Sequence, residues 1–288
     1  MLLADLLAGT ASRPCPVPAA SPRILVFDSG IGGLTVLAEL MRLRPDADYV
    51  YAADDAAFPY GALAPNTMVA RCLRVADRLL STHRPDLVVV ACNTMATLVL
   101  PHLRHRFDLP FVGTVPAIKP AAAASRSRRF TVLATPGTVA RDYTRGLIEA
   151  YAGDCRVDLV GSDVLAGYAE AELAGSPVTD AALSAAIAPC FGDGEGARTD
   201  TVVLACTHYP LLRARMERLA PWPVAWIDPA PAIARRAGDL VGRANRAGDG
   251  ARLAVFTGGT GLTPALREAL ASRGLPDVVV DPVPSNLS

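Results

Sequence analysis

The sequence predicts an α/β protein built from two similar three-layer domains with mainly parallel sheets, whose active site lies in the cleft between them. Short β-rich runs alternate with longer helical stretches along the chain, which is typical of parallel sheets covered by helices. Hydrophobic residues make up 51% and charged residues 19% of the 288 residues, a balance that suits a compact enzyme and argues against disorder. The order of strands and motifs then recurs in the second half, which indicates a second, similar domain.

In the first half, each expected strand is a short run rich in β-branched or aromatic residues and is followed by residues that favour turns. Strands are expected at 23–27, 49–53, 87–91 and 111–113, and helices at 34–44, 67–83 and 97–107. The first strand runs into a glycine-rich turn at 28–33, and the second into a loop that contains Pro59-Tyr60-Gly61. These elements predict a first domain that ends near residue 117.

The second half repeats the pattern. Strands are expected at 130–134, 157–160, 200–205, 224–227 and 252–256, and helices at 139–151, up to 173, 179–191, 211–219, 232–244 and 263–273. The second domain is expected to cover 118–222, and residues 1–22 form a loosely ordered N-terminal extension. Periodicity alone does not decide whether the tail joins the second domain or returns to the first.

Charge and cysteine usage narrow the class of protein. The formal net charge is zero, so no overall field attracts nucleic acid or an anionic membrane. The six cysteines contain no CxxC pair, so a reducing, cytoplasmic setting is expected. Asp5 interrupts the N-terminal apolar stretch, unlike in a secretory signal, and no apolar run approaches the ~20 residues of a membrane span.

Two cysteines stand in nearly the same setting in the two halves. Cys92 follows the run Val88-Val89-Val90-Ala91, and Cys206 follows Val202-Val203-Leu204-Ala205. Ligands of open α/β sheets collect beyond the carboxyl ends of the strands, so both thiols are expected at one shared site. A following helix N-terminus is expected to lower the pKa of each thiol. Two opposed thiols suit a reaction in which one removes a proton and the other returns it to the opposite face, as in a racemase without a cofactor.

Further polar residues follow the same strand ends. Asp28 opens the turn Asp28-Ser29-Gly30-Ile31-Gly32-Gly33, which lacks the spacing of a nucleotide loop; Asp28 either belongs to a site for a carboxylate or caps the next helix, and spacing leaves both open. Asn93-Thr94 and Thr207-His208 offer neutral donors beside the thiols or cap the helices that follow. His208 also lies within reach of Cys206 as a proton partner.

No cofactor or metal is expected. Lys119 is the one lysine of the chain and lies between prolines, a poor setting for the Schiff base of a pyridoxal-phosphate enzyme. His102 and His105 share a helix face without an evident third ligand.

The chain resembles the glutamate racemases of the aspartate/glutamate racemase superfamily. The resemblance covers about residues 24–228 and rests on four motifs. They are Val26-Phe27-Asp28-Ser29-Gly30-Ile31-Gly32-Gly33-Leu34-Thr35-Val36-Leu37, Pro59-Tyr60-Gly61, Ala91-Cys92-Asn93-Thr94 and Cys206-Thr207-His208-Tyr209-Pro210-Leu211-Leu212. The last motif distinguishes these enzymes from most aspartate racemases, which lack the His-Tyr-Pro.

The resemblance implies interconversion of L- and D-glutamate, which supplies D-glutamate for peptidoglycan synthesis. It implies that Cys92 takes the α-proton of D-glutamate and Cys206 that of L-glutamate. It further implies that the tail, 223–288, returns to the first domain, which then comprises 23–117 plus 223–288. The implied helpers in catalysis are His208, Asp28 and Glu170, and the implied substrate contacts are Asp28, Ser29, Tyr60, Gly61, Asn93, Thr94, Thr135, Thr207 and His208. A homodimer is left open, because the sequence does not report the oligomeric state.

One loop departs from the family pattern. The family usually has Gly-Asp-Thr-Ala-Arg before Pro-Tyr-Gly, whereas this chain has Ala53-Asp54-Asp55-Ala56-Ala57-Phe58. The Thr and the Arg are therefore lost, and Asp55 adds a charge.

Three other functions compete with this prediction. Aspartate racemase is the nearest, and the His-Tyr-Pro sequence argues against it. A decarboxylase-like enzyme with a single cysteine is disfavoured because both thiols are present. A two-domain amino-acid-binding protein that closes on its ligand needs no paired reactive thiols. If glutamate slows the alkylation of the thiols, this result favours the racemase over the binding protein.

Overall fold

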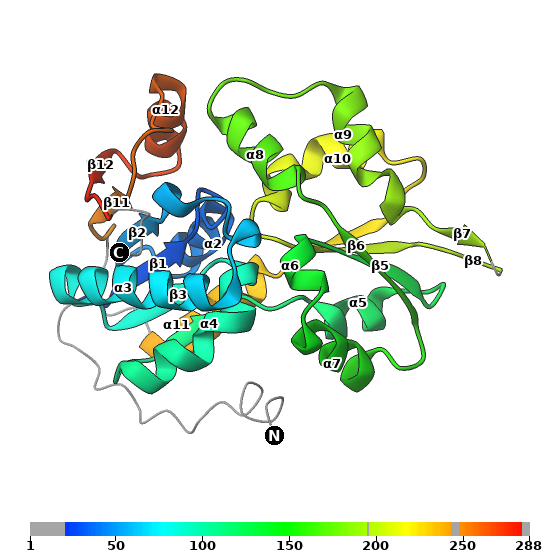
Figure 1. Cartoon of the computed structure of the whole chain (residues 1–288), viewed down its shortest axis with the longest axis horizontal. Coiled ribbons are helices and arrows are strands. Elements are labelled where there is room, and N and C mark those ends of the chain that lie inside the picture. Colours follow the sequence, from blue (N-terminus) through cyan, green and yellow to red (C-terminus); the bar gives the residue numbers. More distant parts are fainter. Residues whose placement is uncertain (1–20, 195, 243–247, 284–288) are drawn as a thin grey trace.

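The strands of the computed structural model form two parallel sheets that lie in two lobes (Figure 1). The structure describes residues 21–194, 196–242 and 248–283. The larger sheet has the order β12 (Asp277–Val280), β11 (Arg252–Phe256), β2 (Asp48–Ala53), β1 (Arg23–Asp28), β3 (Leu87–Val90), β4 (Phe111–Gly113). The smaller has the order β10 (Ala225–Ile227), β9 (Thr201–Ala205), β5 (Arg129–Ala134), β6 (Arg156–Gly161). The α/β architecture with parallel sheets is thus confirmed.

Helices cover both faces of each sheet. Along β1, Ile24 and Val26 pack into one core, and Leu25 and Phe27 pack into the core on the opposite face, because successive side chains of a strand point to opposite sides. The helices around the larger sheet are α2 (Leu34–Leu43), α3 (Pro65–His83), α4 (Asn93–Arg106), α11 (Ala230–Val241) and α12 (Pro264–Ser272). Those around the smaller sheet are α5 (Ile118–Ala124), α6 (Pro136–Val139), α7 (Asp142–Tyr151), α8 (Leu165–Leu173), α9 (Asp180–Ile187) and α10 (Arg213–Leu219). Each sheet is therefore the middle of three layers.

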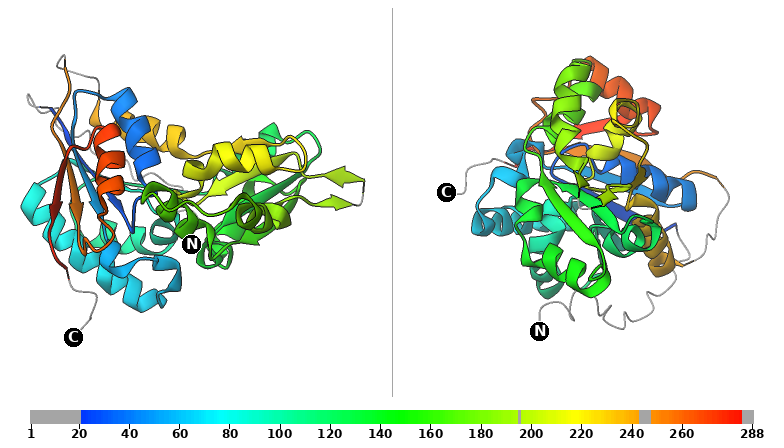
Figure 2. Two further views of the ribbon diagram at one scale, coloured as in Figure 1. Left: turned by 90° about the horizontal axis from the view of Figure 1, so that it is seen from above. Right: turned by 90° about the vertical axis from the view of Figure 1, so that its right-hand side faces the viewer.

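Short elements connect these layers. Single turns of 3₁₀ helix lie at η1 (Asp55–Ala57), η2 (Tyr60–Ala62), η3 (Ala188–Cys190) and η4 (Tyr209–Leu212). A short antiparallel ribbon, β7 (Asp193–Gly194) with β8 (Ala197–Arg198), projects from the smaller lobe (Figure 2). No helix in the described ranges is long and apolar enough to cross a membrane.

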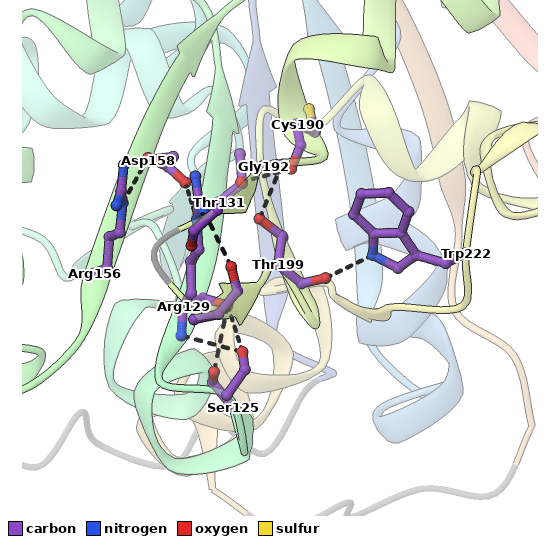
Figure 3. A network of polar contacts seen from close by, with 12 residues as sticks. Ser125, Arg129, Thr131, Arg156, Asp158, Cys190, Gly192, Thr199 and Trp222 are labelled. Carbon is purple, nitrogen blue, oxygen red and sulfur yellow. Dashed lines mark hydrogen bonds and ion pairs between the residues drawn. The ribbon is translucent and has the colours of Figure 1, made fainter.

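A buried arginine ties the ribbon to the smaller sheet. Arg129 on β5 donates to Asp158 on β6 at 2.8 Å and to the carbonyls of Gly194 and Ala197 at 3.3 and 3.2 Å. The surrounding network also holds the Trp222 indole, which donates to the carbonyl of Thr199 (Figure 3). A Cβ at Gly192 would collide with the Arg129 guanidinium, so this glycine provides the space for the arginine.

Several expected boundaries are wrong. The helix expected at 139–151 is two helices, because Thr135 caps a short helix that begins at Pro136 and the extended backbone of Arg141 interrupts it before α7. Helix α4 begins at Asn93 instead of residue 97, since Cys92 is already its N-cap. Helix α5, the ribbon and β12 were not expected, and the end of the helix expected at 232–244 lies outside the described residues, as do residues 1–20 of the expected extension.

The chain returns from the smaller to the larger sheet after β10. The expected boundary at 222/223 would place β10 with the larger sheet, but this strand pairs with β9 of the smaller one. Helix α11 then packs in the core of the larger sheet through Ala230, Ile233 and Ala234, and β11 pairs with β2. Pairing with β9 extends the smaller sheet to Ile227, so sheet membership moves this boundary to the turn before α11.

Candidate active site

The two predicted thiols lie buried at the ends of corresponding central strands. Cys92 follows β3 and is the N-cap of α4, while Cys206 follows β9. Each residue is only 6% exposed. The thiols are near enough for the charge of Cys206 to act on the pKa of Cys92. The structure therefore brings together two cysteines that the sequence separates widely.

Burial sets the protonation of Cys92. It raises the pKa of this thiol to about 12, and the nearby Asp28 carboxylate acts in the same direction. The Ser29 hydroxyl, which donates to the Cys92 sulfur at 3.5 Å, and the Met95 amide lower the pKa by less. The expectation that the helix N-terminus gives Cys92 a lowered pKa is thus wrong, because the loss of water outweighs these donors.

Cys206 belongs to a polar chain that crosses between the lobes. Its sulfur lies 3.8 Å from Nδ1 of His208, and Nε2 of His208 lies 2.8 Å from Oε1 of Glu170 on α8. The backbone amide of Ile31, in the turn after β1, donates to the same Glu170 oxygen at 2.9 Å. Burial alone would lower the pKa of His208, but its hydrogen bonds to Cys206 and Glu170 and their charges raise it well above its ordinary value.

Asp28 shows both predicted features. Its carboxylate accepts the amides of Ser29 at 2.7 Å and of Gly33 at 2.5 Å, so it organises the turn that leads into α2. It is also fully buried beside the site, and burial raises its pKa to about 6 although the charge of His208 lowers it. The Tyr51 hydroxyl lies 3.5 Å from the Asp28 carboxylate and donates to the carbonyl of Gly30 at 2.7 Å.

Neutral donors surround the thiols. Asn93 is 2% exposed, and neither its amide nitrogen nor its oxygen has a hydrogen-bond partner in the described parts of the chain. Thr94 lies 2.9 Å from Thr135 and 3.4 Å from Thr138, measured between their hydroxyl oxygens, and these two lie 3.0 Å apart. These hydroxyls bridge the larger and smaller lobes. A buried amide without partners is costly, so Asn93 indicates a place for a polar ligand.

Buried polar side chains hold the loop after β2 in place. The Tyr60 hydroxyl donates to the buried Asp54 carboxylate at 2.5 Å, and Asp54 pairs with Arg71 of α3 at 2.8 Å from Nε. Tyr60 therefore has its side chain occupied, and the exposed backbone at Gly61 is the part of this motif that is available to a ligand. Asp55, the added charge, accepts the amides of Gly258 and Gly259.

The last predicted substrate contact, Thr207, lies in the same region of the structure as the others. Thr207 is 3% exposed, and its carbonyl accepts the Thr35 hydroxyl at 3.3 Å. No group of three His, Cys, Asp or Glu side chains that could hold a metal occurs in the described ranges. The Lys119 ammonium lies over the Tyr151 ring at 5.6 Å.

Three contributors were missed by sequence reasoning. Tyr51 lies in an apolar strand, where a tyrosine indicates only core packing. Thr138 could have been found from the threonine spacing after β5, since it follows the capping Thr135 by one turn. Phe58 was noted as a departure, and the structure places its ring 5.5 Å from the His208 ring, between centroids.

The comparisons with known proteins agree with this arrangement. The family model described as Asp/Glu/Hydantoin racemase matches residues 34–237, a span that contains both thiols. The chain belongs to the Asp/Glu/Hydantoin racemase family. Among members of this racemase family, the chain is 55% identical to a glutamate racemase of Agrobacterium fabrum over 82% of this chain and 88% of that protein. It is 58% identical to one of Mesorhizobium japonicum over 76% and 84%, respectively.

Solved structures of the racemase family have the same fold. The Escherichia coli glutamate racemase, in complex with L-glutamate and the activator UDP-MurNAc-Ala, superposes with a TM-score of 0.83 at 38% identity, covering 91% of this chain and 99% of that one. The Aquifex pyrophilus glutamate racemase gives 0.68 at 29% identity, covering 90% and 97%. The fold of the present chain is thus that of the glutamate racemases, as the resemblance implied.

Proposed function

We propose that this protein interconverts L-glutamate and D-glutamate without a cofactor, with Cys206 and Cys92 as the two acid–base groups. The observation that carries the proposal is the pair of buried, interacting thiols at corresponding strand ends, each with its own polar partner. Ser29 donates to Cys92, and His208 lies beside Cys206. The names of the relatives support glutamate as the substrate.

The two cysteines alone account for every proton that is removed or returned in the proposed reaction. From L-glutamate, the Cys206 thiolate removes the α-proton, and the Cys92 thiol returns a proton to the opposite face. The product is D-glutamate, with a Cys206 thiol and a Cys92 thiolate, and the reverse reaction starts from that state. The raised pKa of Cys92 suits its role as the proton donor in the first direction.

The site also offers help for the carbanion. The α-proton of an amino acid is a very weak acid, so charge that grows on the carboxylate requires donors that are already in place. The unpartnered Asn93 amide and the Thr94 hydroxyl are such donors at the N-terminus of α4. His208, with its pKa raised by Glu170 and Cys206, stabilises a thiolate at Cys206 as an imidazolium.

The proposal extends to the cellular role. D-glutamate made by this reaction would supply peptidoglycan synthesis, and a reducing cytoplasm would keep both thiols active. A homodimer is compatible with the proposal, and chromatography with light scattering tests the assembly.

The deciding experiment follows the α-proton of each glutamate enantiomer by NMR in D2O. The wild-type protein should exchange and invert both enantiomers without any added cofactor. Cys92→Ala and Cys206→Ala should both lose inversion by at least about 10³-fold, because each lacks one of the two groups. Cys206→Ala should exchange only D-glutamate, and Cys92→Ala only L-glutamate.

Cys190→Ala is the matched control, since Cys190 is also fully buried but lies in the core between β9 and α9. It should keep wild-type rates. Action on aspartate but not glutamate would keep the chemistry and overturn the substrate. If neither amino acid exchanges, the racemase proposal fails.

A further inference from the structure

The His208–Glu170 pair of the smaller lobe rests on three residues of the larger lobe. We call Gly30, Gly32 and Phe58 the His208 seat. We propose that the His208 seat positions the Cys206 half of the reaction, so that this base is assembled only when the two lobes meet. This inference rests on the proposed racemase function.

The two glycines make the close approach possible. A Cβ at Gly32 would collide with the His208 ring and lie 2.7 Å from the His208 backbone nitrogen. A Cβ at Gly30 would collide with the Glu170 carboxylate and lie 3.2 Å from Nε2 of His208. Contacts shorter than 3.0 Å essentially do not occur for real Cβ atoms, and at Gly32 the obstacle includes backbone, which cannot rotate away. The missing side chains therefore provide space for the pair.

Between these glycines, the chain contributes a directed hydrogen bond. The Ile31 amide donates to the Glu170 oxygen that also binds Nε2 of His208. Three consecutive residues of the turn thus lie against the His208–Glu170 pair. Ile31 donates a hydrogen bond to it, and Gly30 and Gly32 leave room for it because they have no Cβ. The turn lacks the spacing of a nucleotide loop, and its Ile31 amide instead holds a carboxylate of the protein itself.

Phe58 closes the remaining side. Its ring is tilted by 44° to the His208 ring at 5.5 Å between centroids, within the range at which an aromatic ring attracts a cation. The groups that face His208 are Cys206, Glu170 and, through its charge, Asp28. Phe58 is uncharged and therefore adds no charge to this set.

The consequence for the reaction is an asymmetry between proton exchange and inversion. The two enantiomers have equal free energy in water, so kcat/KM must remain equal in both directions for every variant. The fate of the carbanion is not constrained in this way. When D-glutamate has lost its proton to Cys92, the Cys92 thiol exchanges that proton for a deuteron of the solvent. A displaced Cys206 returns no deuteron to the opposite face, so Cys92 returns its own deuteron and regenerates deuterated D-glutamate instead.

The test is the ratio of deuterated D-glutamate to deuterated L-glutamate formed early from D-glutamate in D2O. Gly32→Ala should slow inversion by about 10²-fold, the scale expected for a small misplacement of a catalytic group, and should raise this ratio. Phe58→Leu should raise it about two- to fivefold, while Phe58→Tyr, which keeps the ring, should restore the wild-type ratio. Phe58 is partly exposed, so Phe58→Leu should still fold. This variant provides the test if Gly32→Ala does not fold.

Gly167→Ala is the matched control. Gly167 lies on α8, the helix of Glu170, and a Cβ there meets no atom within 4 Å; its rates and ratio should match the wild type. Equal loss of exchange and inversion in the seat variants, or an unchanged ratio in both, overturns the seat. A wild-type protein that neither exchanges nor inverts glutamate overturns the proposed function, and the assignment of the seat to that reaction with it.

Discussion

Burial has opposite consequences for neighbouring residues of the site. It raises the pKa of Asp28 from 3.8 to about 6, although His208 and two backbone amides oppose it. For His208, by contrast, the hydrogen bonds to Cys206 and Glu170 outweigh the loss of water. The site thus places a carboxyl whose pKa is raised to about 6 beside an imidazole whose pKa is also raised.

Asp28 should make the folded protein less stable as the pH rises. With a raised pKa, the native carboxyl keeps a proton that the unfolded chain releases, so stability falls between about pH 4 and pH 6. The shift corresponds to roughly 3 kcal/mol. Asp28→Asn cannot ionise, so its free energy of unfolding relative to the wild type should increase by about that amount from pH 4 to pH 7. Urea unfolding at both pH values measures it, with the exposed Asp142→Asn as control; parallel pH profiles for Asp28→Asn and the wild type would contradict the prediction.

Thr138 should act on substrate binding through its neighbours. Thr138→Val deprives the hydroxyls of Thr94 and Thr135 of a partner, so KM for glutamate should rise roughly two- to tenfold while kcat changes little. Thr138→Ser keeps the hydroxyl and should remain close to the wild type. Steady-state kinetics of both variants check this, and a fall in kcat at constant KM would show that the hydroxyl has another role.

Sequence reasoning reached the residues that follow buried strands and missed those within other contexts. Cys92, Asp28, Thr135 and Cys206 were found because the carboxyl end of a parallel strand is where ligands collect. Tyr51 and Phe58 carry no such positional signal, since an apolar strand and a loop accept aromatic residues for packing alone. The pKa of Cys92 was predicted with the wrong sign because the extent of burial is not visible in the sequence.

Among the secondary elements, those buried on both faces were the most predictable. Strand β11 begins and ends at the predicted residues, and the central strands β1 and β3 do so to within one residue, because a central parallel strand forms a nearly continuous apolar run. Elements at the margins had weaker patterns: β12 lies at the sheet edge with Val279 and Val280 exposed, and the short helix α5 contains Pro120 in its first turn, where proline is tolerated. The start of α4 was missed because Asn93 and Thr94 were considered as donors or as caps before the helix and not as its first residues.

The stability of the smaller lobe should depend strongly on Arg129. Its side chain is 8% exposed and joins β5, β6 and the ribbon. Arg129→Met leaves the Asp158 carboxylate and two carbonyls without this partner, so the free energy of unfolding should fall by about 1–3 kcal/mol. Arg145→Met removes an exposed ion pair on α7 and should change little. Chemical denaturation of both variants compares them; an equal effect would show that the buried arginine acts only as a surface charge.

At the scale of the whole molecule, the site exists only where the lobes meet. Ser29 and Cys92 come from the larger lobe, Cys206 and His208 come from the smaller one, and the Ile31–Glu170 hydrogen bond and the threonine hydroxyls cross between them. Two similar halves were predictable from the repeated strand order. Their mutual orientation was not, because it depends on contacts such as the glycine turn against His208, for which the sequence carries no periodic signal.

The Ile31 amide should therefore report closure of the lobes. Its hydrogen bond to Glu170 opens when the lobes separate, and a ligand that binds both lobes favours the closed form. Glutamate at 100 times its Kd should add about 2.7 kcal/mol to the closed form, and hydrogen exchange at Ile31 should slow accordingly, up to about a hundredfold. Glu170→Ala removes the acceptor, so Ile31 should exchange faster and lose this response, while the amide of Val26, within the central strand β1, should be unaffected in both proteins. Unchanged exchange at Ile31 on adding glutamate would mean that the lobes are already closed without ligand, so that substrate enters through local motion of the loop at Gly61 rather than through separation of the lobes.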